Sequence, residues 1–347
     1  MAAPTTTDHI DEEALRAFLV QSLPGFDTGD ELAVDRVQAG HSNLTFTVRA
    51  GTGRYVLRRP PAGPLPPSAH DMLREYRILE RLARANLRVP RPVASSDDLS
   101  IVGAPFYLME RLDGFVIRKA VPPELPDEAS RRALSADIIE LMAELHAADW
   151  KAIGLDEVVP ASGDYLHRQI RRWQKMWAAT RTRTVPYLEE VGHWVEQNVP
   201  HSPEATIVHG DFKLDNLIIR PGTPPRCAAL LDWELSTIGD PLADLAWLMV
   251  WWSEPGEQIE EPLRLCMATS EGGFLSRDEL RALYEQRTGR DTSRIGWYQV
   301  FGLWRLAILF EGSYKRHLSG TADDEWFAEL ETGVPYLIER ARHLIDC

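Results

Sequence analysis

The sequence predicts an α+β fold in two parts, a small antiparallel β-rich N-terminal lobe and a mainly helical C-terminal lobe. Three strand-like segments separated by short turns within residues 32–58 predict an antiparallel meander. Apolar residues at helical spacing over 128–149 predict a long core helix. Since the pattern changes from strand-like to helical, the prediction assigns residues 1–112 to the N-terminal lobe and 113–347 to the C-terminal lobe.

The N-terminal elements follow one another in a simple order. Alternation of apolar and polar residues marks the strands, and Gly51-Thr52-Gly53 is a hairpin signal before the third one. The predicted elements are a helix over 11–20, strands over 32–38, 44–48 and 54–58, a helix over 70–86 and a strand over 101–110.

Composition narrows the class of protein. The 347 residues are enough for about two domains. With 38 Lys+Arg against 52 Asp+Glu the net charge is -14, so a nucleic-acid partner or an anionic membrane surface is disfavoured. The three cysteines form no zinc-binding or redox spacing, the N-terminus has no signal-peptide pattern and no apolar run spans a bilayer. These features predict a cytoplasmic protein.

Residues 207–232 carry the densest group of chemistry-bearing side chains. Two short apolar segments on either side of turn-forming residues predict a hairpin. In the expected antiparallel register Asn216 lies opposite Asp232, and Asp211 lies in the loop at the same end. Oxygen ligands of this kind hold Mg²⁺ against phosphates. The alternative interpretation is a structural turn with surface carboxylates.

The spacing around Asp211 matches a known phosphotransfer pattern. Asp211, Lys213 and Asn216 stand as D-x-K-x-x-N. In a protein-kinase catalytic loop an Asp accepts the substrate proton and an Asn binds metal, and a second metal-binding Asp follows a hairpin. Here His209-Gly210-Asp211 replaces the His-Arg-Asp form, and Asp232-Trp233-Glu234 replaces Asp-Phe-Gly.

On these residues the sequence resembles the aminoglycoside phosphotransferase / choline kinase-like superfamily. The segment HGDFKLDN, followed by LLDWELSTIGDPLADLAW, carries the resemblance, which extends from about Gly40 to the 300s. Within that superfamily the sequence is similar to the kinase-like domains found with acyl-CoA dehydrogenases. The resemblance implies a two-lobed protein-kinase-like fold, ATP and Mg²⁺ as cofactors, and transfer of the γ-phosphoryl group to a hydroxyl of a small molecule.

The resemblance also implies a role for each residue of the motif. Asp211 is expected to orient the acceptor hydroxyl and take its proton, and Lys213 to neutralise the transferred group. Asn216 and Asp232 are expected to hold Mg²⁺. Bracing roles in the same loop are expected for His209, Asp240 and Asp244.

A cation on the ATP phosphates is the next requirement. In kinase-like folds a lysine on the third strand supplies it, held by a carboxylate on the next helix, and Arg58 stands at that position here. Glu75 lies on the apolar stripe of the following helix and is the expected partner, because a carboxylate there needs an ion pair. Its alternative partner is a neighbouring surface arginine.

Two further segments are expected to contact the nucleotide. The turn with Gly40, Ser42 and Asn43 joins the first two strands and is expected to cover the phosphates, with an ordinary hairpin turn as the alternative. Glu110 and Leu112 lie at the lobe boundary, where the backbone is expected to bind adenine.

The acceptor is the least defined part of the prediction. Four cationic residues at helical spacing predict a basic face that meets an anionic acceptor, such as a hydroxy acid or its CoA thioester: Arg168, Arg171, Arg172 and Lys175. The alternative is a solvated basic face. Trp247, Trp251, Trp252 and Trp304 are interpreted as core residues. Glu311 and Tyr314 are considered for the acceptor pocket.

The sequence therefore predicts an ATP- and Mg-dependent small-molecule kinase. One alternative is an aminoglycoside or protein kinase, although the Asp-Phe-Gly form and an Ala-Pro-Glu segment are absent from the sequence. Another is a pseudokinase that binds ATP without turnover, which the arginine at position 58 favours. Retention of Asp211, Asn216 and Asp232 argues against that second alternative.

Overall fold

The computed structural model describes residues 10–37, 43–61, 71–159, 163–202, 204–321 and 325–346. The chain divides into two compact units. Unit 1 comprises Met1–Asp113, Lys151–Val158 and Ala228–Glu234, and unit 2 comprises Gly114–Trp150, Val159–Cys227 and Leu235–Cys347. Unit 1 thus includes two later segments of the chain, which the sequence prediction had assigned to the C-terminal lobe.

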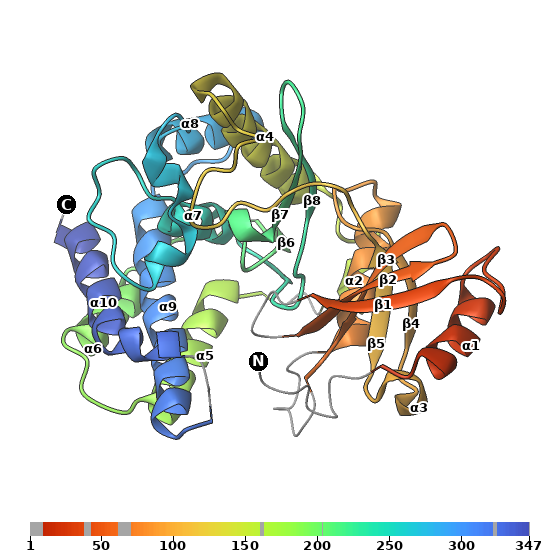
Figure 1. Ribbon diagram of the computed structural model, residues 1–347. Coiled ribbons are helices and arrows are strands. Elements are labelled where there is room, and N and C mark those ends of the chain that lie inside the picture. The colour runs from red at the N-terminus through yellow and green to blue at the C-terminus, as the bar shows by residue number, and fades with distance from the viewer. Residues whose placement is uncertain are drawn as a thin grey trace. The chain divides into compact units, whose positions relative to one another are not determined.

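Unit 1 is built on a five-stranded antiparallel sheet with the strand order β1-β2-β3-β5-β4 (Figure 1). The predicted three-stranded meander is confirmed, and β4 is an additional strand that the sequence patterns did not reveal. The elements are α1 (Glu12–Ser22), β1 (Leu32–Val37), β2 (Leu44–Ala50), β3 (Gly53–Arg59), α2 (Met72–Arg84), β4 (Pro92–Ser96), α3 (Leu99–Val102) and β5 (Phe106–Glu110).

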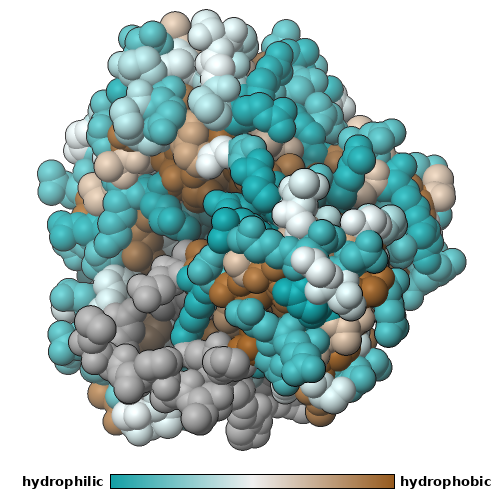
Figure 2. Space-filling model, turned by 45° about the vertical axis from the view of Figure 1, so that its right-hand side comes forward, coloured by the Kyte–Doolittle hydropathy of each residue, from teal (hydrophilic) through white to brown (hydrophobic). Residues whose placement is uncertain are grey.

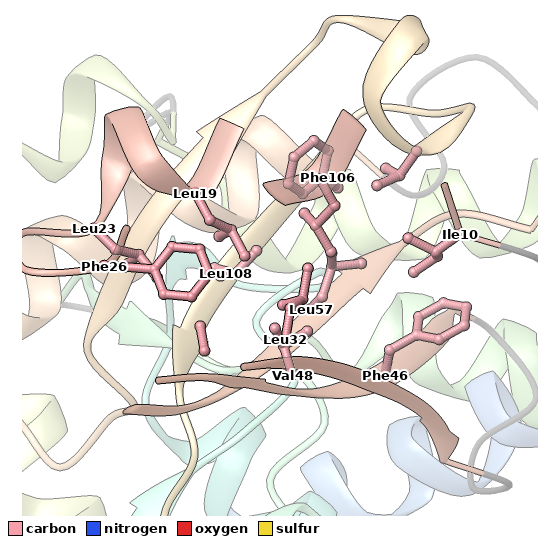
Figure 3. Close-up of a cluster of buried hydrophobic side chains, with 13 residues drawn as sticks. Ile10, Leu19, Leu23, Phe26, Leu32, Phe46, Val48, Leu57, Phe106 and Leu108 are labelled. Atoms are coloured by element: carbon pink, nitrogen blue, oxygen red, sulfur yellow. The ribbon is translucent and has the colours of Figure 1, made fainter. Parts of the chain in front are cut away.

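A cluster of buried apolar side chains joins α1 to this sheet (Figure 3). Leu19 on α1 and Leu108 on β5 are both fully buried, and Phe46 and Val48 point to the same face of β2 because alternate residues of a strand share a face. Each such side chain contributes roughly 1.5–3 kcal/mol when removed from water. The cluster therefore fixes the sheet on which β3 presents Arg58.

Helix α2 has the amphipathic pattern that the sequence predicts. Asp71 caps its first turn by accepting the Arg74 N–H at 2.9 Å. Glu75, Leu79 and Leu82 are all buried on one face, as their spacing predicts. A carboxylate is thereby placed in the apolar interior of unit 1.

Unit 2 is mainly helical, with two small two-stranded sheets, β6-β9 and β7-β8. Its elements are α4 (Glu128–Ala147), α5 (Tyr165–Thr180), α6 (Leu188–Gln197), β6 (Thr206–Val208), β7 (Leu217–Arg220), β8 (Arg226–Leu230), β9 (Thr237–Gly239), α7 (Leu242–Trp251), α8 (Arg277–Thr288), α9 (Ile295–Leu318) and α10 (Leu330–Asp346). The division between the units runs through β8. The predicted hairpin is present as β7 and β8.

Helix α9 is the central helix of unit 2. It has 24 residues and contacts α5, α6, α7 and α10. Over most of its length it is apolar on every side, the pattern of a helix enclosed by others. Arg305 interrupts this pattern in mid-helix and is nevertheless only 8% exposed.

The outer surface has a different character. The face shown in Figure 2 is mostly hydrophilic, with hydrophobic residues in scattered patches. Among the residues that the structure describes, no helix combines the length and the hydrophobicity that a membrane span requires. The most apolar helix, α7, is buried within unit 2 instead.

Candidate active site

Arg58 and Glu75 form a buried ion pair in unit 1. The Arg58 Nη1 donates to Glu75 Oε1 at 2.6 Å, and the two side chains are 10% and 1% exposed. Burial raises the pKa of Glu75, although Arg58 opposes this by favouring the carboxylate. The pair predicted from the sequence is therefore present, and it holds the guanidinium of β3 in one place.

Asp232 completes this cluster in unit 1. Its Oδ1 lies 3.3 Å from Arg58 Nη2, and its side chain is 30% exposed. Asp232 has a φ of 65°, a left-handed conformation that is costly for a residue other than glycine. The next residue, Trp233, donates its N–H to Glu75 Oε1 at 3.1 Å. The strained backbone at Asp232 is thus fixed by the same carboxylate that holds Arg58.

The structure describes only some of the other residues that are predicted to contact the nucleotide. Gly40 and Ser42 lie outside the described residues. Asn43 is buried and donates to Glu234 Oε2 at 3.4 Å. Glu110 ends β5, and its carboxylate accepts the Arg91 N–H at 2.9 Å. Leu112 follows that strand and lies outside any helix or strand. The nucleotide-binding roles of these residues stay predictions.

In unit 2, the Asp211 carboxylate is held by three donors. Its Oδ1 accepts the Trp247 Nε1–H at 2.8 Å. Its Oδ2 accepts an amide hydrogen of Asn216 at 2.9 Å and lies 3.4 Å from Lys213 Nζ. The Asn216 Nδ2 also donates to the Asp211 backbone oxygen at 2.8 Å. The D-x-K-x-x-N spacing therefore closes into a compact loop around one carboxylate that is still 21% exposed.

Lys213 is the cation of this loop. Its Nζ lies 3.4 Å from both Asp211 and Asp215 and 5.1 Å from the centre of the Trp251 ring. Burial disfavours its charge, but the two carboxylates outweigh burial and raise the pKa of Lys213 above its ordinary value. The side chain is therefore a fixed positive charge beside Asp211.

Buried acids brace the backbone of the loop. Asp244 accepts the N–H groups of His209 and Gly210 at 2.6 and 2.8 Å. Gly210 has a φ of 83°, and a Cβ there would lie 2.8 Å from the Leu235 backbone oxygen, so only glycine fits. Asp240 accepts the Leu242 N–H and the Tyr298 hydroxyl. These contacts match the bracing that the sequence predicts.

Two residues that sequence reasoning missed lie against Asp211. Trp247, interpreted as a core residue, uses its indole N–H to orient the carboxylate. The Arg305 guanidinium lies 3.8 Å from the centre of the Trp247 ring and donates to the Gly210 backbone oxygen at 2.6 Å. A lone arginine within the apolar run of α9 was the available signal, because a buried charge needs a reason.

The residues considered for the acceptor lie on α5 and α9. On α5, Arg171, Arg172 and Lys175 are exposed and Arg168 is half-buried. Glu311 accepts the Thr182 N–H and hydroxyl, and the Arg183 guanidinium lies 4.5 Å from the centre of the Tyr314 ring. Glu311 and Tyr314 therefore hold the segment after α5, and no bond between them and Asp211 occurs among the described residues.

The donor set suits a hard divalent cation. Both amide hydrogens of Asn216 are directed to Asp211, which leaves the Oδ1 atom as an acceptor, and the Asp232 carboxylate is partly exposed. Mg²⁺ prefers such oxygen atoms and keeps several waters. No cluster of three or more His, Cys, Asp or Glu side chains suited to a metal occurs in the described part of the chain. Asn216 and Asp232 belong to different units, and their sharing of one ion stays a prediction.

Comparisons with known proteins agree with this chemistry. The sequence model of the phosphotransferase enzyme family matches residues 33–294. A rat protein named acyl-CoA dehydrogenase family member 11 is 35% identical over 329 residues, which cover 91% of this chain and 41% of that protein. The chain thus spans about two fifths of the length of this relative.

Solved structures extend the comparison to the fold. A candidate aminoglycoside phosphotransferase of Ralstonia eutropha is 32% identical, with a TM-score of 0.80 and coverage of 97% of this chain and 98% of that one. An aminoglycoside phosphotransferase in complex with AMP-PNP and hygromycin B is 18% identical, with a TM-score of 0.59 and coverage of 95% and 98%. These similarities confirm the predicted two-lobed, kinase-like α+β fold.

Proposed function

Because the chain belongs to the phosphotransferase enzyme family, we propose that it is an ATP- and Mg²⁺-dependent kinase of a small molecule with a hydroxyl group. The observation that carries this proposal is the Asp211 carboxylate, fixed by Trp247 and Asn216 and placed beside the Lys213 ammonium. A fixed base next to a fixed cation is the arrangement that phosphoryl transfer requires. A cytoplasmic setting, where ATP is abundant, is part of the proposal.

The proposed reaction joins the acceptor oxygen to the γ-phosphorus of ATP while the bond from that phosphorus to the β,γ-bridging oxygen breaks. Asp211 accepts the hydroxyl proton and later returns it to solvent, and ADP and the phosphorylated acceptor leave. Lys213 lowers the energy of the negative charge on the transferred group. The loop contributes mainly by positioning, because Asp244 and Trp247 hold its backbone and its carboxylate in place.

The residues of unit 1 are assigned to the nucleotide. Arg58, held by Glu75, is proposed to bind the ATP phosphates, and its planar guanidinium can contact two oxygens at once. The turn around Asn43 and the backbone near Leu112 are proposed to contact the phosphates and the base. Asn216 and Asp232 are proposed to hold Mg²⁺, which would neutralise phosphate charge.

One observation favours a second candidate, a protein that binds ATP without turnover. The Arg58 guanidinium already contacts Glu75, Tyr107 and Asp232, so part of its hydrogen-bonding capacity is used within unit 1. A nucleotide-binding protein of this kind would be stabilised by Mg-ATP and would transfer no phosphate.

The change Asp211→Asn separates the two candidates. Without the base, phosphate transfer from radiolabelled ATP to a pool of cell metabolites is expected to fall by about 10²–10⁴-fold. The rise in melting temperature with Mg-ATP is expected to stay within a degree or so of the wild-type rise, because Asp211 is not assigned to ATP. Normal turnover by the variant would overturn the role of Asp211, and a wild type that binds ATP without transfer would support the second candidate.

A further inference from the structure

Arg305 is a buried arginine outside any ion pair among the described residues. Burial lowers the pKa of Arg305, and the charges of the Asp211 and Asp244 carboxylates oppose this only in part. Its side chain lies within α9 and is only 8% exposed. Its one hydrogen bond to a described residue goes to the neutral Gly210 backbone oxygen at 2.6 Å. No carboxylate of a described residue lies within ion-pair distance of its nitrogens, whereas Arg58 in unit 1 has the Glu75 carboxylate at 2.6 Å. Since buried charges are normally paired, the position of Arg305 needs an explanation.

The guanidinium is placed beside the proposed base. It lies 3.8 Å from the centre of the Trp247 ring, and the edge of the same ring donates its N–H to Asp211. Arg305 and Asp211 are thus held against one indole, the cation at its face and the carboxylate at its edge. A small molecule whose hydroxyl reaches Asp211 would therefore lie near Arg305.

A second cation is close to the same place. The Arg172 guanidinium on α5 lies 5.6 Å from the centre of the Trp173 ring, and Arg305 lies 5.6 Å from the centre of that ring too. Arg172 is exposed, and its charge disfavours that of Arg305 less than the Asp211 and Asp244 carboxylates favour it. An anion bound beside the two guanidinium groups would be attracted by both, whereas a cation would be repelled by both.

We propose that Arg305 binds an oxyanion of the acceptor, so that the phosphate is transferred to the hydroxyl of a small hydroxy acid or of a hydroxylated phosphate ester. The inference rests on the proposed kinase function. It names the class of substrate: a hydroxyl group for Asp211 and a carboxylate or phosphate for the guanidinium, whose planar set of N–H donors matches both oxyanions.

Matched pairs of acceptors test this inference. The probes are glycerate with glyceramide, 3-hydroxybutyrate with its amide, and glycerol 3-phosphate with glycerol. Wild-type protein with Mg-ATP is expected to favour the anion of at least one pair by about 10–100-fold in kcat/KM, the contribution of a hydrogen bond to a charged group. The pair that shows the preference tells a carboxylate from a phosphate. The same anion is expected to raise the melting temperature more than its neutral partner.

Two variants of Arg305 and one control assign the preference to this residue. Arg305→Met is expected to lower kcat/KM for the anion to that of the neutral partner, and Arg305→Lys to keep part of the preference. Mg-ATP stabilisation should persist in both. Arg316→Met, which removes an exposed arginine from the same helix, should leave the preference unchanged.

The outcomes separate this inference from the kinase proposal. A preference for the anion that survives in Arg305→Met, or equal rates and equal thermal shifts for every pair in the wild type, would overturn the role of Arg305. A wild type that phosphorylates only neutral or cationic acceptors would leave the kinase proposal standing and reject the inference. If Arg305→Met does not fold, Arg305→Lys carries the test: its preference is expected to fall below that of the wild type, and an unchanged preference would overturn the role of Arg305. Absence of Mg-ATP stabilisation in the wild type would reject the kinase proposal itself.

Discussion

The charged clusters of unit 1 and unit 2 are built in different ways. In unit 1 the buried Arg58 has the Glu75 carboxylate at 2.6 Å, and Asp232 at 3.3 Å adds a second negative charge. In unit 2 the equally buried Arg305 has a neutral carbonyl oxygen and aromatic rings as its described contacts. Arg58 is thus paired directly with a carboxylate, whereas Arg305 has only the longer-range attraction of Asp211 and Asp244, which offsets its burial in part.

This difference separates a structural use of charge from a recognition use. A paired cation such as Arg58 is held rigidly, which suits its proposed contact with the phosphates of the nucleotide. Burying a cation that has no ion pair lowers the stability of the free protein, and binding of an anion offsets this loss. Substitutions at Arg305 and at the Arg58–Glu75 pair are therefore expected to change the unfolding free energy by different amounts.

Breaking the Arg58–Glu75 ion pair in unit 1 is expected to have the largest effect on stability. Glu75→Gln leaves the buried Arg58 without its main counter-ion, which costs about 3 kcal/mol or more of unfolding free energy. Urea denaturation monitored by circular dichroism measures the loss.

The same helix supplies a matched control for this change. Glu80 pairs with Arg84 at 2.9 Å on the surface of α2, with both side chains at least 37% exposed. Glu80→Gln is expected to cost about 0.5 kcal/mol or less because water screens the pair. Equal losses in the two variants would contradict the assignment of Arg58 and Glu75 as a buried, mutually dependent pair.

Replacing Asp244, which holds the backbone of the Asp211 loop in unit 2, is expected to lower the unfolding free energy by an intermediate, pH-dependent amount. Burial acts to raise the pKa of Asp244, but His146, His209 and the Gly210 N–H outweigh burial and lower it. Asp244→Asn weakens two hydrogen bonds to a carboxylate and is expected to cost about 1.5–3 kcal/mol at pH 7.

The sign of the pH dependence follows from the lowered pKa. The carboxylate stabilises the fold fully above its ordinary value of about 3.9, and the contribution is lost as the pH falls through the lower folded value. The stability difference between wild type and Asp244→Asn, measured by denaturation from pH 7 down to pH 2, is therefore expected to shrink only at the acid end. A difference that is constant with pH would contradict the role of the carboxylate charge.

Local sequence patterns predicted part of each cluster, and contacts between residues far apart in the sequence were missed. Glu75 stands out because helical periodicity places a carboxylate on an apolar stripe, and the D-x-K-x-x-N spacing identifies Asp211 and Asn216 because it is local. Trp247 has the same pattern as a core tryptophan, and its contact with Asp211 joins residues 36 positions apart, which no local pattern encodes. The short strands β6 and β9 were missed because three residues carry no measurable periodicity.

Among the changes to buried groups, replacing Arg305 is expected to have the smallest effect on stability. Arg305→Met loses one hydrogen bond to a neutral oxygen and the contact with the Trp247 ring, but it leaves no carboxylate without a partner and ends the cost of burying a charge. These terms oppose each other, so the unfolding free energy is expected to change by no more than about 1 kcal/mol, against a loss of about 3 kcal/mol for Glu75→Gln. Denaturation of both variants under one set of conditions measures the contrast. A loss in Arg305→Met as large as that in Glu75→Gln would mean that the guanidinium is a structural element of unit 2.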